Sequence, residues 1–293
     1  MGRDLHEHSP AARQVFDKVD EALGWRLSHL MFTGPAEELQ QTANSQPAIL
    51  TASLASMAAA KEQADGPAWA QPAFVAGHSL GEYTALVAAG VADLQNTIRL
   101  VQERGRLMQE ASDRCPGSMV AILGLEESAV LELCRESGTQ IANINSPGQI
   151  VISGERDKVA EAVKLAHARG AKRAIPLPVN GGFHSYLMGP ALEGMQQTLK
   201  GVQFREPATP IVANCTARPL GAISEVKAEL LQQLCGCVRW QDCITYMANS
   251  GVTTFIEFGP GRVLGGLVKR IAPEAQVMSV GDLPSLRRLL NSQ

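Results

Sequence analysis

Short apolar runs alternate with segments of helical periodicity along much of the chain. Residues 72–77 form an apolar run that leads into a segment with helical spacing, residues 79–90, which ends at a glycine. Further apolar runs of strand length lie at residues 210–214 and 253–259. Such alternation predicts a mostly parallel sheet flanked by helices. We therefore expect an α/β fold.

The middle of the chain has a different pattern. Between residues 119 and 178 the predicted order of elements is strand, helix, strand, strand, helix, strand. This βαββαβ order is that of the ferredoxin-like unit, which is compact by itself. We predict a small ferredoxin-like subdomain over residues 115–181, inserted into a larger α/β subdomain that residues 1–114 and 182–293 form.

Composition narrows the class of protein. The chain has 293 residues, of which 45% are hydrophobic and 19% are charged, so it can bury a sizeable core. A formal net charge of −3 argues against nucleic acid as a partner. No apolar window reaches the roughly 20 residues that span a bilayer, and the first residues lack the character of a secretory or transit signal. We expect a cytoplasmic protein with no membrane partner.

The six cysteines are scattered, and none lies in a pair with the spacing of a zinc site. Cys235 and Cys237 form the only close pair. We expect reduced, structural cysteines and no bound metal.

The sequence GHSLG at residues 77–81 fits G-x-S-x-G, the nucleophile elbow. In that motif a tight turn between a strand and a helix exposes the serine hydroxyl, and the predicted strand and helix flank Ser79 as the motif requires. The backbone N–H of Leu80 then becomes one donor to an oxyanion. The alternative is a structural turn without chemistry.

A serine hydroxyl needs a base, and histidine is the usual one near neutral pH. His184 follows a predicted strand and a pair of glycines and precedes a predicted helix, so its ring can project into a cleft at a strand end. A merely buried histidine is the alternative. No histidine follows it, whereas an α/β-hydrolase usually has its catalytic histidine late in the chain, so a standard serine hydrolase is disfavoured. The other histidines are expected to be structural or exposed: His6, His8, His29, His78 and His167.

Arg104 lies at the edge of an apolar helix face. The predicted helix over residues 92–112 has one stripe of apolar or small residues, and Arg104 follows Val101 by three positions and precedes Met108 by four. A guanidinium there requires an anionic partner. Glu82 or another acid is one candidate, and a substrate carboxylate, held by the planar fork of arginine, is the other.

Eight blocks of the sequence, in order, resemble malonyl-CoA:acyl carrier protein transacylases and the related acyltransferase domains of polyketide synthases. The resemblance covers nearly the whole chain and implies an α/β-hydrolase-like large subdomain with the small ferredoxin-like subdomain inserted. The blocks are GPAEELQQTANSQPAILTAS (34–53), GHSLGEYTALVAAG (77–90), RGRLMQEA (104–111), NSPGQIVISG (145–154), GAKRAIPLPV (170–179), FHSYLM (183–188), VRW (238–240) and EFGPGRVLGGLVKRI (257–271).

The resemblance implies a role for each candidate residue. Ser79 is the acylated nucleophile, His184 is its base, and Arg104 pairs with the malonyl carboxylate. A main-chain carbonyl rather than an acid orients the histidine in this family, and the matching position is Arg239. Two further residues, Gln46 and Asn145, match family residues near the cleft, where a structural role is the alternative.

The implied reaction moves a malonyl group from malonyl-CoA to the phosphopantetheine thiol of acyl carrier protein through a malonyl-serine ester, for fatty acid or polyketide synthesis. Coenzyme A and phosphopantetheine thioesters are substrates, and no permanent cofactor is needed. We expect a monomer with a local basic patch for an acidic carrier protein. Candidates for the patch are Arg106, Lys172, Arg173, Arg262, Lys269 and Arg270.

The chain departs from the family pattern in two places. Family members begin with a strand and a G-Q-G-x-Q loop, which contributes an oxyanion donor, whereas this sequence opens at residues 1–5 without them. A proline usually precedes the VRW block, and residues 234–238 lack it. Phe183 resembles the residue of malonyl-selective members.

Two alternative functions stay open. The first departure allows a catalytically impaired or non-enzymatic family member. The other alternative is a trans-acting polyketide acyltransferase, which has the same chemistry and differs in the carrier that it serves. A thioesterase, which would release free malonate, is disfavoured by Arg104 and by the absence of a late histidine.

Overall fold

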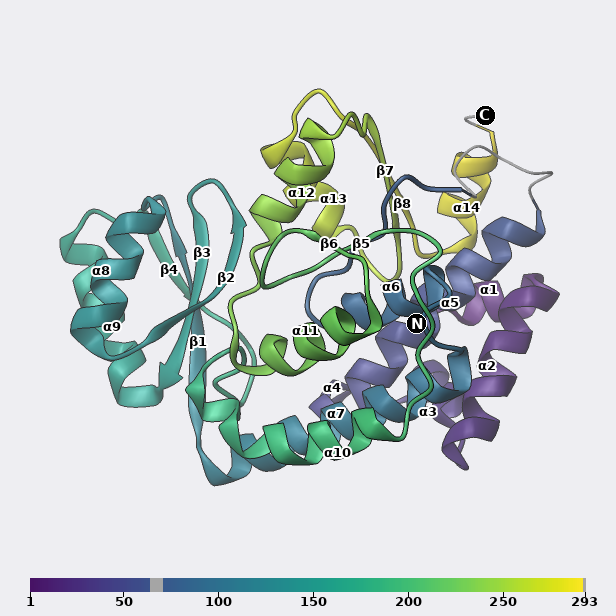
Figure 1. Ribbon diagram of the computed structural model, residues 1–293, viewed down its shortest axis with the longest axis horizontal. Coiled ribbons are helices and arrows are strands. Elements are labelled where there is room, and N and C mark those ends of the chain that lie inside the picture. Colours follow the sequence, from purple (N-terminus) through teal and green to yellow (C-terminus); the bar gives the residue numbers. More distant parts are fainter. Residues whose placement is uncertain (64–70, 292–293) are drawn as a thin grey trace.

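The computed structural model describes residues 1–63 and 71–291. Helices make up most of the large part of the molecule, and a separate four-stranded sheet projects from one side (Figure 1). The helices are α1 (Arg3–His8), α2 (Pro10–Leu23), α3 (Leu27–Thr33), α4 (Ala36–Gln40), α5 (Thr42–Glu62), α6 (Gly81–Ala88), α7 (Leu94–Arg114), α8 (Glu127–Ser137), α9 (Arg156–Ala168), η2 (Tyr186–Ala191), α10 (Leu192–Lys200), α11 (Ile223–Cys235), α12 (Trp240–Asn249), α13 (Val263–Ile271) and α14 (Leu283–Leu290). The strands are β1 (Gly117–Leu123), β2 (Gln140–Ser146), β3 (Gln149–Glu155), β4 (Arg173–Pro176), β5 (Ile211–Val212), β6 (Pro219–Leu220), β7 (Thr254–Phe258) and β8 (Gln276–Val280).

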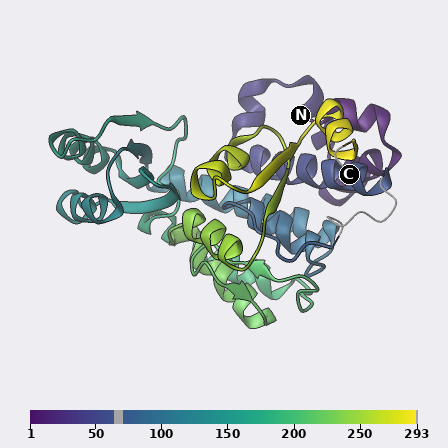
Figure 2. The ribbon, with the colours of Figure 1, turned by 90° about the horizontal axis from the view of Figure 1, so that it is seen from above.

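The projecting unit consists of β1 to β4 with α8 and α9, and it extends to one side of the helical part in both views (Figures 1 and 2). Its strand order is β2-β3-β1-β4, and every neighbouring pair is antiparallel. This is the order that the predicted ferredoxin-like βαββαβ pattern produces. The subdomain boundaries near residues 115 and 181 stay a prediction.

Both faces of this small sheet are buried. The side chains of β1 point alternately to the two faces. Val120 and Ile122 join the core beneath α8 and α9, whereas Met119 and Ala121 join a cluster on the other face with Phe183. Phe183 precedes His184 in the chain. The small sheet therefore packs directly against the segment that carries the predicted base.

The large part is built around the long helices α5 and α7, which pack against each other and against α2 (Figure 1). The mixed α/β class is confirmed, but the parallel pairing is less extensive than expected. Within the described ranges, the apolar run at residues 72–77 contributes a single parallel bridge, between Val75 and Ile211, and the run at 210–214 yields the two-residue strand β5. Among the named strands, β7 and β8 are the parallel pair.

Helix α7 is amphipathic over its 21 residues, and the buried arginine lies on its apolar face. Asp93 caps its first turn, where its side chain accepts a hydrogen bond from the N–H of Asn96. Ile98, Val101 and Met108 lie on the buried face, as the sequence predicted, and Arg104 lies on it with them. Of the helices in the described parts of the chain, none is long and apolar enough to cross a bilayer.

Two leucines of α8 test the packing of the small sheet. Leu133 is fully buried in the core beneath α8 and α9, whereas Leu131 of the same helix is 42% exposed. We expect Leu133→Ala to lower the free energy of unfolding by about 2–5 kcal/mol. The matched substitution Leu131→Ala should change it by about 0.5 kcal/mol or less. Urea unfolding of both variants measures the difference, and equal losses would contradict this packing.

Candidate active site

Ser79 lies at the tight turn that the G-x-S-x-G pattern predicted, directly before α6. Its φ angle is 51°, in the left-handed region that residues with a Cβ rarely adopt. Gly77 permits the turn, because a Cβ there would lie 2.0 Å from the backbone of Gly81. At Gly81 itself a Cβ would meet nothing within 4 Å, so packing requires only the first glycine of the motif.

Asn214 holds this turn from a distant part of the chain. Its side-chain oxygen accepts the N–H of Ser79 at 2.7 Å, and its side-chain amide donates to the carbonyl of Gly77 at 2.7 Å. Asn214 is fully buried two residues after β5. The strained conformation of the nucleophile is thus fixed by two hydrogen bonds to one side chain. No local pattern indicates this role, except that the residue ends a predicted strand.

Ser79 and His184 form a hydrogen-bonded dyad. The Oγ atom of Ser79 is 2.7 Å from Nε2 of His184, and Nδ1 of His184 is 2.7 Å from the main-chain carbonyl of Gln233. A carbonyl only accepts, so Nδ1 carries the proton and Nε2 is free to accept from the serine hydroxyl. The tautomer is therefore the one that a general base requires.

The carbonyl that orients His184 belongs to Gln233 and not to Arg239, the position that the resemblance suggested. Arg239 lies after the end of α11, and its guanidinium is paired with Asp242. Gln233 lies in the last turns of α11, where carbonyls have no partner within the helix and are free to accept from a side chain. The alignment of motifs found the right region but missed the residue by six positions.

The ring of His184 is buried and uncharged. Burial, reinforced by the positive charge of Arg104, lowers its pKa from 6.5 to about 3. The residue also has a positive φ of 56°, like the serine that it contacts. The base is thus neutral at physiological pH and ready to accept a proton.

Arg104 lies beside the dyad with 1% of its surface exposed. Its Nη2 donates to Ser79 Oγ at 3.2 Å and to Gln233 Oε1 at 2.8 Å, and its Nη1 donates to Gln46 Oε1. The Tyr83 ring centre is 5.1 Å from its Cζ. Within residues 1–63 and 71–291, no carboxylate is hydrogen-bonded to this guanidinium, and its Nε has no partner. The charge is held by neutral acceptors, which leaves it available to an anion.

Glu82 is a fully buried acid close to Ser79 in the sequence, and its carboxyl group is hydrogen-bonded to Gln233 rather than to Arg104. Its Oε1 accepts the N–H of Asn214 at 2.8 Å, and its Oε2 accepts Gln233 Nε2 at 2.5 Å. Burial, together with the nearby Glu229 carboxyl, raises the pKa of Glu82 well above its usual range, although the donors from Asn214 and Gln233 and the charge of Arg104 oppose this shift. In the present geometry both carboxyl oxygens accept from N–H groups. A direct Glu82–Arg104 ion pair, one of the two alternatives from the sequence, is not formed.

Leu80 and Asn145 are brought to the same site. Leu80 is the residue before α6, and no described residue accepts its N–H, which leaves that donor free for an oxyanion at the helix start. Asn145, near the end of β2 in the small sheet, accepts a 2.9 Å hydrogen bond from His78 Nε2 through its side-chain oxygen. His78 also stacks edge-on against Trp240. Asn145 thus links the small sheet to the turn that carries Ser79.

These residues line one cleft of about 1660 Å³. Ser79, His184, Arg104, Gln46 and Asn145 all reach its surface, together with apolar side chains such as Met119 and Phe183. The space is large enough for an extended thioester substrate. In the described residues, no group of three or more His, Cys, Asp or Glu side chains could hold a metal ion.

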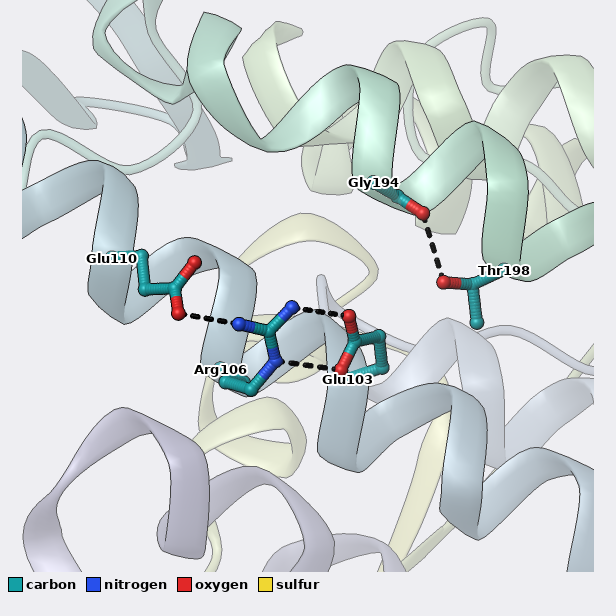
Figure 3. Close-up of polar contacts among 5 residues, drawn as sticks. All are labelled: Glu103, Arg106, Glu110, Gly194 and Thr198. Atoms are coloured by element: carbon teal, nitrogen blue, oxygen red, sulfur yellow. Dashed lines mark hydrogen bonds and ion pairs between the residues drawn. The ribbon is translucent and has the colours of Figure 1, made fainter.

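The basic residues proposed for carrier binding are not equivalent. Arg106 of α7 lies between Glu103 and Glu110 and is bonded to both, as Figure 3 shows. Arg270 instead donates from Nη1 to Gln149 Oε1 at 2.8 Å, a neutral contact that leaves its charge uncompensated by that partner. The two acids offset the charge of Arg106, which makes it a weaker candidate than Arg270 for an acidic partner.

The chain is similar to known proteins along nearly its whole length. Residues 1–288 match the model of the acyl transferase domain family. A malonyl CoA-acyl carrier protein transacylase from Bacillus subtilis is 44% identical over 96% of this chain and 89% of its own length. The corresponding protein from Haemophilus influenzae is 42% identical over 97% of this chain and 92% of its own length.

Solved structures give the same result. An acyl-carrier-protein S-malonyltransferase from Bartonella henselae superimposes with a TM-score of 0.94 at 42% identity, covering 100% of this chain and 94% of the other. A malonyl-transacylase in complex with its type II polyketide synthase acyl carrier protein gives a TM-score of 0.95 at 39% identity, covering 100% and 95%. With the match along nearly its whole length and the serine, histidine and arginine gathered in one cleft, the chain belongs to the acyl transferase domain family.

Proposed function

We propose that this protein transfers a malonyl group from malonyl-CoA to the phosphopantetheine thiol of an acyl carrier protein, in fatty acid or polyketide synthesis. One observation carries the proposal: a buried arginine without a carboxylate partner in the described chain donates a hydrogen bond to the hydroxyl of a serine in a serine–histidine dyad. An acyl group that carries its own carboxylate satisfies both features together. The names of the relatives support the same activity.

In the first half of the reaction, His184 Nε2 takes the proton of Ser79 as Oγ attacks the thioester carbonyl. The negative charge that develops on the carbonyl oxygen is stabilised by the N–H of Leu80 at the start of α6. The C–S bond then breaks, and the proton on His184 passes to the departing coenzyme A thiolate. A malonyl ester of Ser79 remains.

In the second half, the phosphopantetheine thiol gives its proton to His184 Nε2, and its sulfur attacks the ester carbonyl. The C–O bond to Ser79 breaks, and the proton returns to Oγ. The products are malonyl carrier protein and free enzyme, so two substrates use one site in turn. This order predicts ping-pong kinetics.

Arg104 couples substrate choice to the base. Burial is the main cause of the lowered pKa of His184, and the positive charge of Arg104 lowers the pKa further. A malonyl carboxylate bound to the guanidinium would offset this second contribution. The ring then becomes more basic when the correct acyl group is present. An acetyl group has no carboxylate and leaves the base weak.

We also propose that the enzyme acts as a monomer in the cytoplasm, with neither nucleic acid nor membrane as a partner. The net charge of −3 supports the first exclusion, since phosphate backbones attract basic proteins. Size-exclusion chromatography with light scattering measures the oligomeric state directly. Gln46 is proposed as a substrate-site residue through Arg104, and Asn145 as a residue that supports the turn of Ser79.

The nucleophile is tested by intact-protein mass after brief exposure to malonyl-CoA. We expect one malonyl adduct on the unmodified enzyme and none on Ser79→Ala, because the hydroxyl of Ser79 is the one that the base His184 contacts. Addition of a carrier protein with its phosphopantetheine should remove the adduct and malonylate the carrier. An adduct of equal amount on Ser79→Ala, or free malonate as the only product, would contradict the proposal.

Arg104 is tested by acyl selectivity. We expect Arg104→Ala to slow acylation by malonyl-CoA by about 10- to 100-fold, the range for losing hydrogen bonds to a charged group, while acylation by acetyl-CoA falls much less. Arg104→Lys keeps the charge but not the planar fork and should recover only part of the malonyl rate. The rates come from quenched-flow mass measurements, with circular dichroism to check folding. Equal slowing with both thioesters would argue against a carboxylate role.

The state of His184 predicts the pH dependence. Since the pKa of His184 in the folded enzyme is about 3, the base stays neutral well below pH 6.5. The value of kcat/KM for malonyl-CoA should therefore change by about two-fold or less from pH 7.5 to pH 5.5. Stability should behave differently: the unfolded histidine gains a proton below 6.5, so the free energy of unfolding should decline as pH falls through this range. His184→Gln should weaken that decline. An inflection of kcat/KM near 6.5 would show that the base is not held neutral.

A further inference from the structure

The side chain of Gln233 is the point at which the parts of the site meet. Its main-chain carbonyl accepts from His184, and its side-chain amide bonds to three more groups. Oε1 accepts from Arg104 Nη2 at 2.8 Å, and Nε2 donates to the main-chain carbonyl of Ser79 at 2.9 Å and to Glu82 Oε2 at 2.5 Å. Gln233 is fully buried, so water does not replace any of these partners.

The orientation of this amide has chemical consequences. An amide has an accepting end and a donating end, and only one of its two orientations places the oxygen against the guanidinium. The reverse orientation would set an NH₂ group against Arg104, with a donor facing a donor, and would leave the Ser79 carbonyl without its N–H. Arg104 and Ser79 therefore both depend on which way the amide lies.

Glu82 favours the same amide orientation as Arg104 and the Ser79 carbonyl, and it is the one of the three that lies away from the reacting atoms. One of its oxygens is occupied by the N–H of Asn214, and the other faces the Gln233 amide. An ionised Glu82 can only accept, so it holds the amide NH₂ on its own side and the amide oxygen on the side of Arg104. Glu82 contacts none of the reacting atoms itself and acts through Gln233.

We propose that Glu82 is a positioning residue for malonyl selectivity, which fixes the Gln233 amide so that its oxygen holds Arg104 beside Ser79. The inference rests on the proposed function, because selectivity is defined for malonyl against acetyl transfer. Glu82 is fully buried in the first turn of α6, and Gln233 comes from α11. The pair thus joins the helix that follows the nucleophile to the helix that orients the base.

The test uses two substitutions of nearly unchanged size. In Glu82→Gln the new side-chain NH₂ faces either the NH₂ of Gln233 or the N–H of Asn214, so that two donors oppose each other. When it faces Gln233, a flip of the Gln233 amide removes this conflict but turns the amide NH₂ toward Arg104. Gln233→Leu removes the side-chain amide but keeps the main-chain carbonyl that His184 contacts. The matched control is Glu229→Gln, which changes another buried acid, one that accepts the N–H of Cys215 at 2.7 Å and has no bond to Gln233.

The readout is the ratio of the first-order rates of Ser79 acylation by malonyl-CoA and by acetyl-CoA, from intact mass. A ratio is independent of the fraction of folded enzyme, so a loss of stability alone does not change it. We expect the ratio to fall about ten-fold or more in Glu82→Gln and in Gln233→Leu, the effect of losing one hydrogen bond to a charged group. The double variant should fall no further than Gln233→Leu alone, because Glu82 acts through that side chain. Glu229→Gln should keep the unmodified ratio.

Three results would overturn the inference. An unchanged ratio in Glu82→Gln would show that the amide orientation does not depend on the carboxylate. A double variant whose ratio falls by the product of the two single effects would show that Glu82 acts independently of Gln233. An equal fall of the ratio in Glu229→Gln would show that the loss of any buried acid has this effect. The absence of any malonyl adduct on the unmodified enzyme would instead count against the proposed function.

Discussion

The arrangement of the site depends on a buried positive charge that is not paired with a carboxylate in the described chain. Removing an ion from water costs several kcal/mol unless other groups replace its hydration. Arg104 receives that replacement from neutral oxygens on two helices and from the nucleophile itself. These acceptors stabilise the guanidinium without neutralising it, so the site retains an electrostatic preference for an anionic acyl group. Binding of such a group supplies the missing countercharge.

A second constraint is the backbone strain at the reacting residues. Ser79 and His184 both have left-handed φ angles, and each is held by contacts from elsewhere in the chain. The turn of Ser79 is clamped by Asn214, and the imidazole is fixed by the carbonyl of Gln233. Positions of this kind persist only where the surrounding structure determines them, and they aim a hydroxyl and a ring at one another before substrate arrives.

Local patterns predicted the parts of the fold that local physics determines. The periodicity of α7 placed Arg104 on a buried face, and the βαββαβ order predicted the small sheet. The remaining contacts depend on tertiary pairing between residues far apart in sequence, such as Glu82 and Gln233, 151 positions apart. A main-chain carbonyl has no residue-specific signature, so the partner of His184 was assigned to Arg239 instead of Gln233. The short strands near residues 75 and 211 were overestimated because an apolar run shows burial but not the extent of pairing.

The central claim is that Arg104 is held for the carboxylate of the acyl group. A crystal structure of the enzyme with malonyl-Ser79, trapped by brief soaking, tests it most directly. The account predicts that both carboxylate oxygens lie within hydrogen-bonding distance of two N–H groups of Arg104, about 2.7–2.9 Å, with the Gln233 amide oxygen still on the guanidinium. A malonyl carboxylate that points to solvent, with Arg104 bonded as it is in the free enzyme, would contradict it.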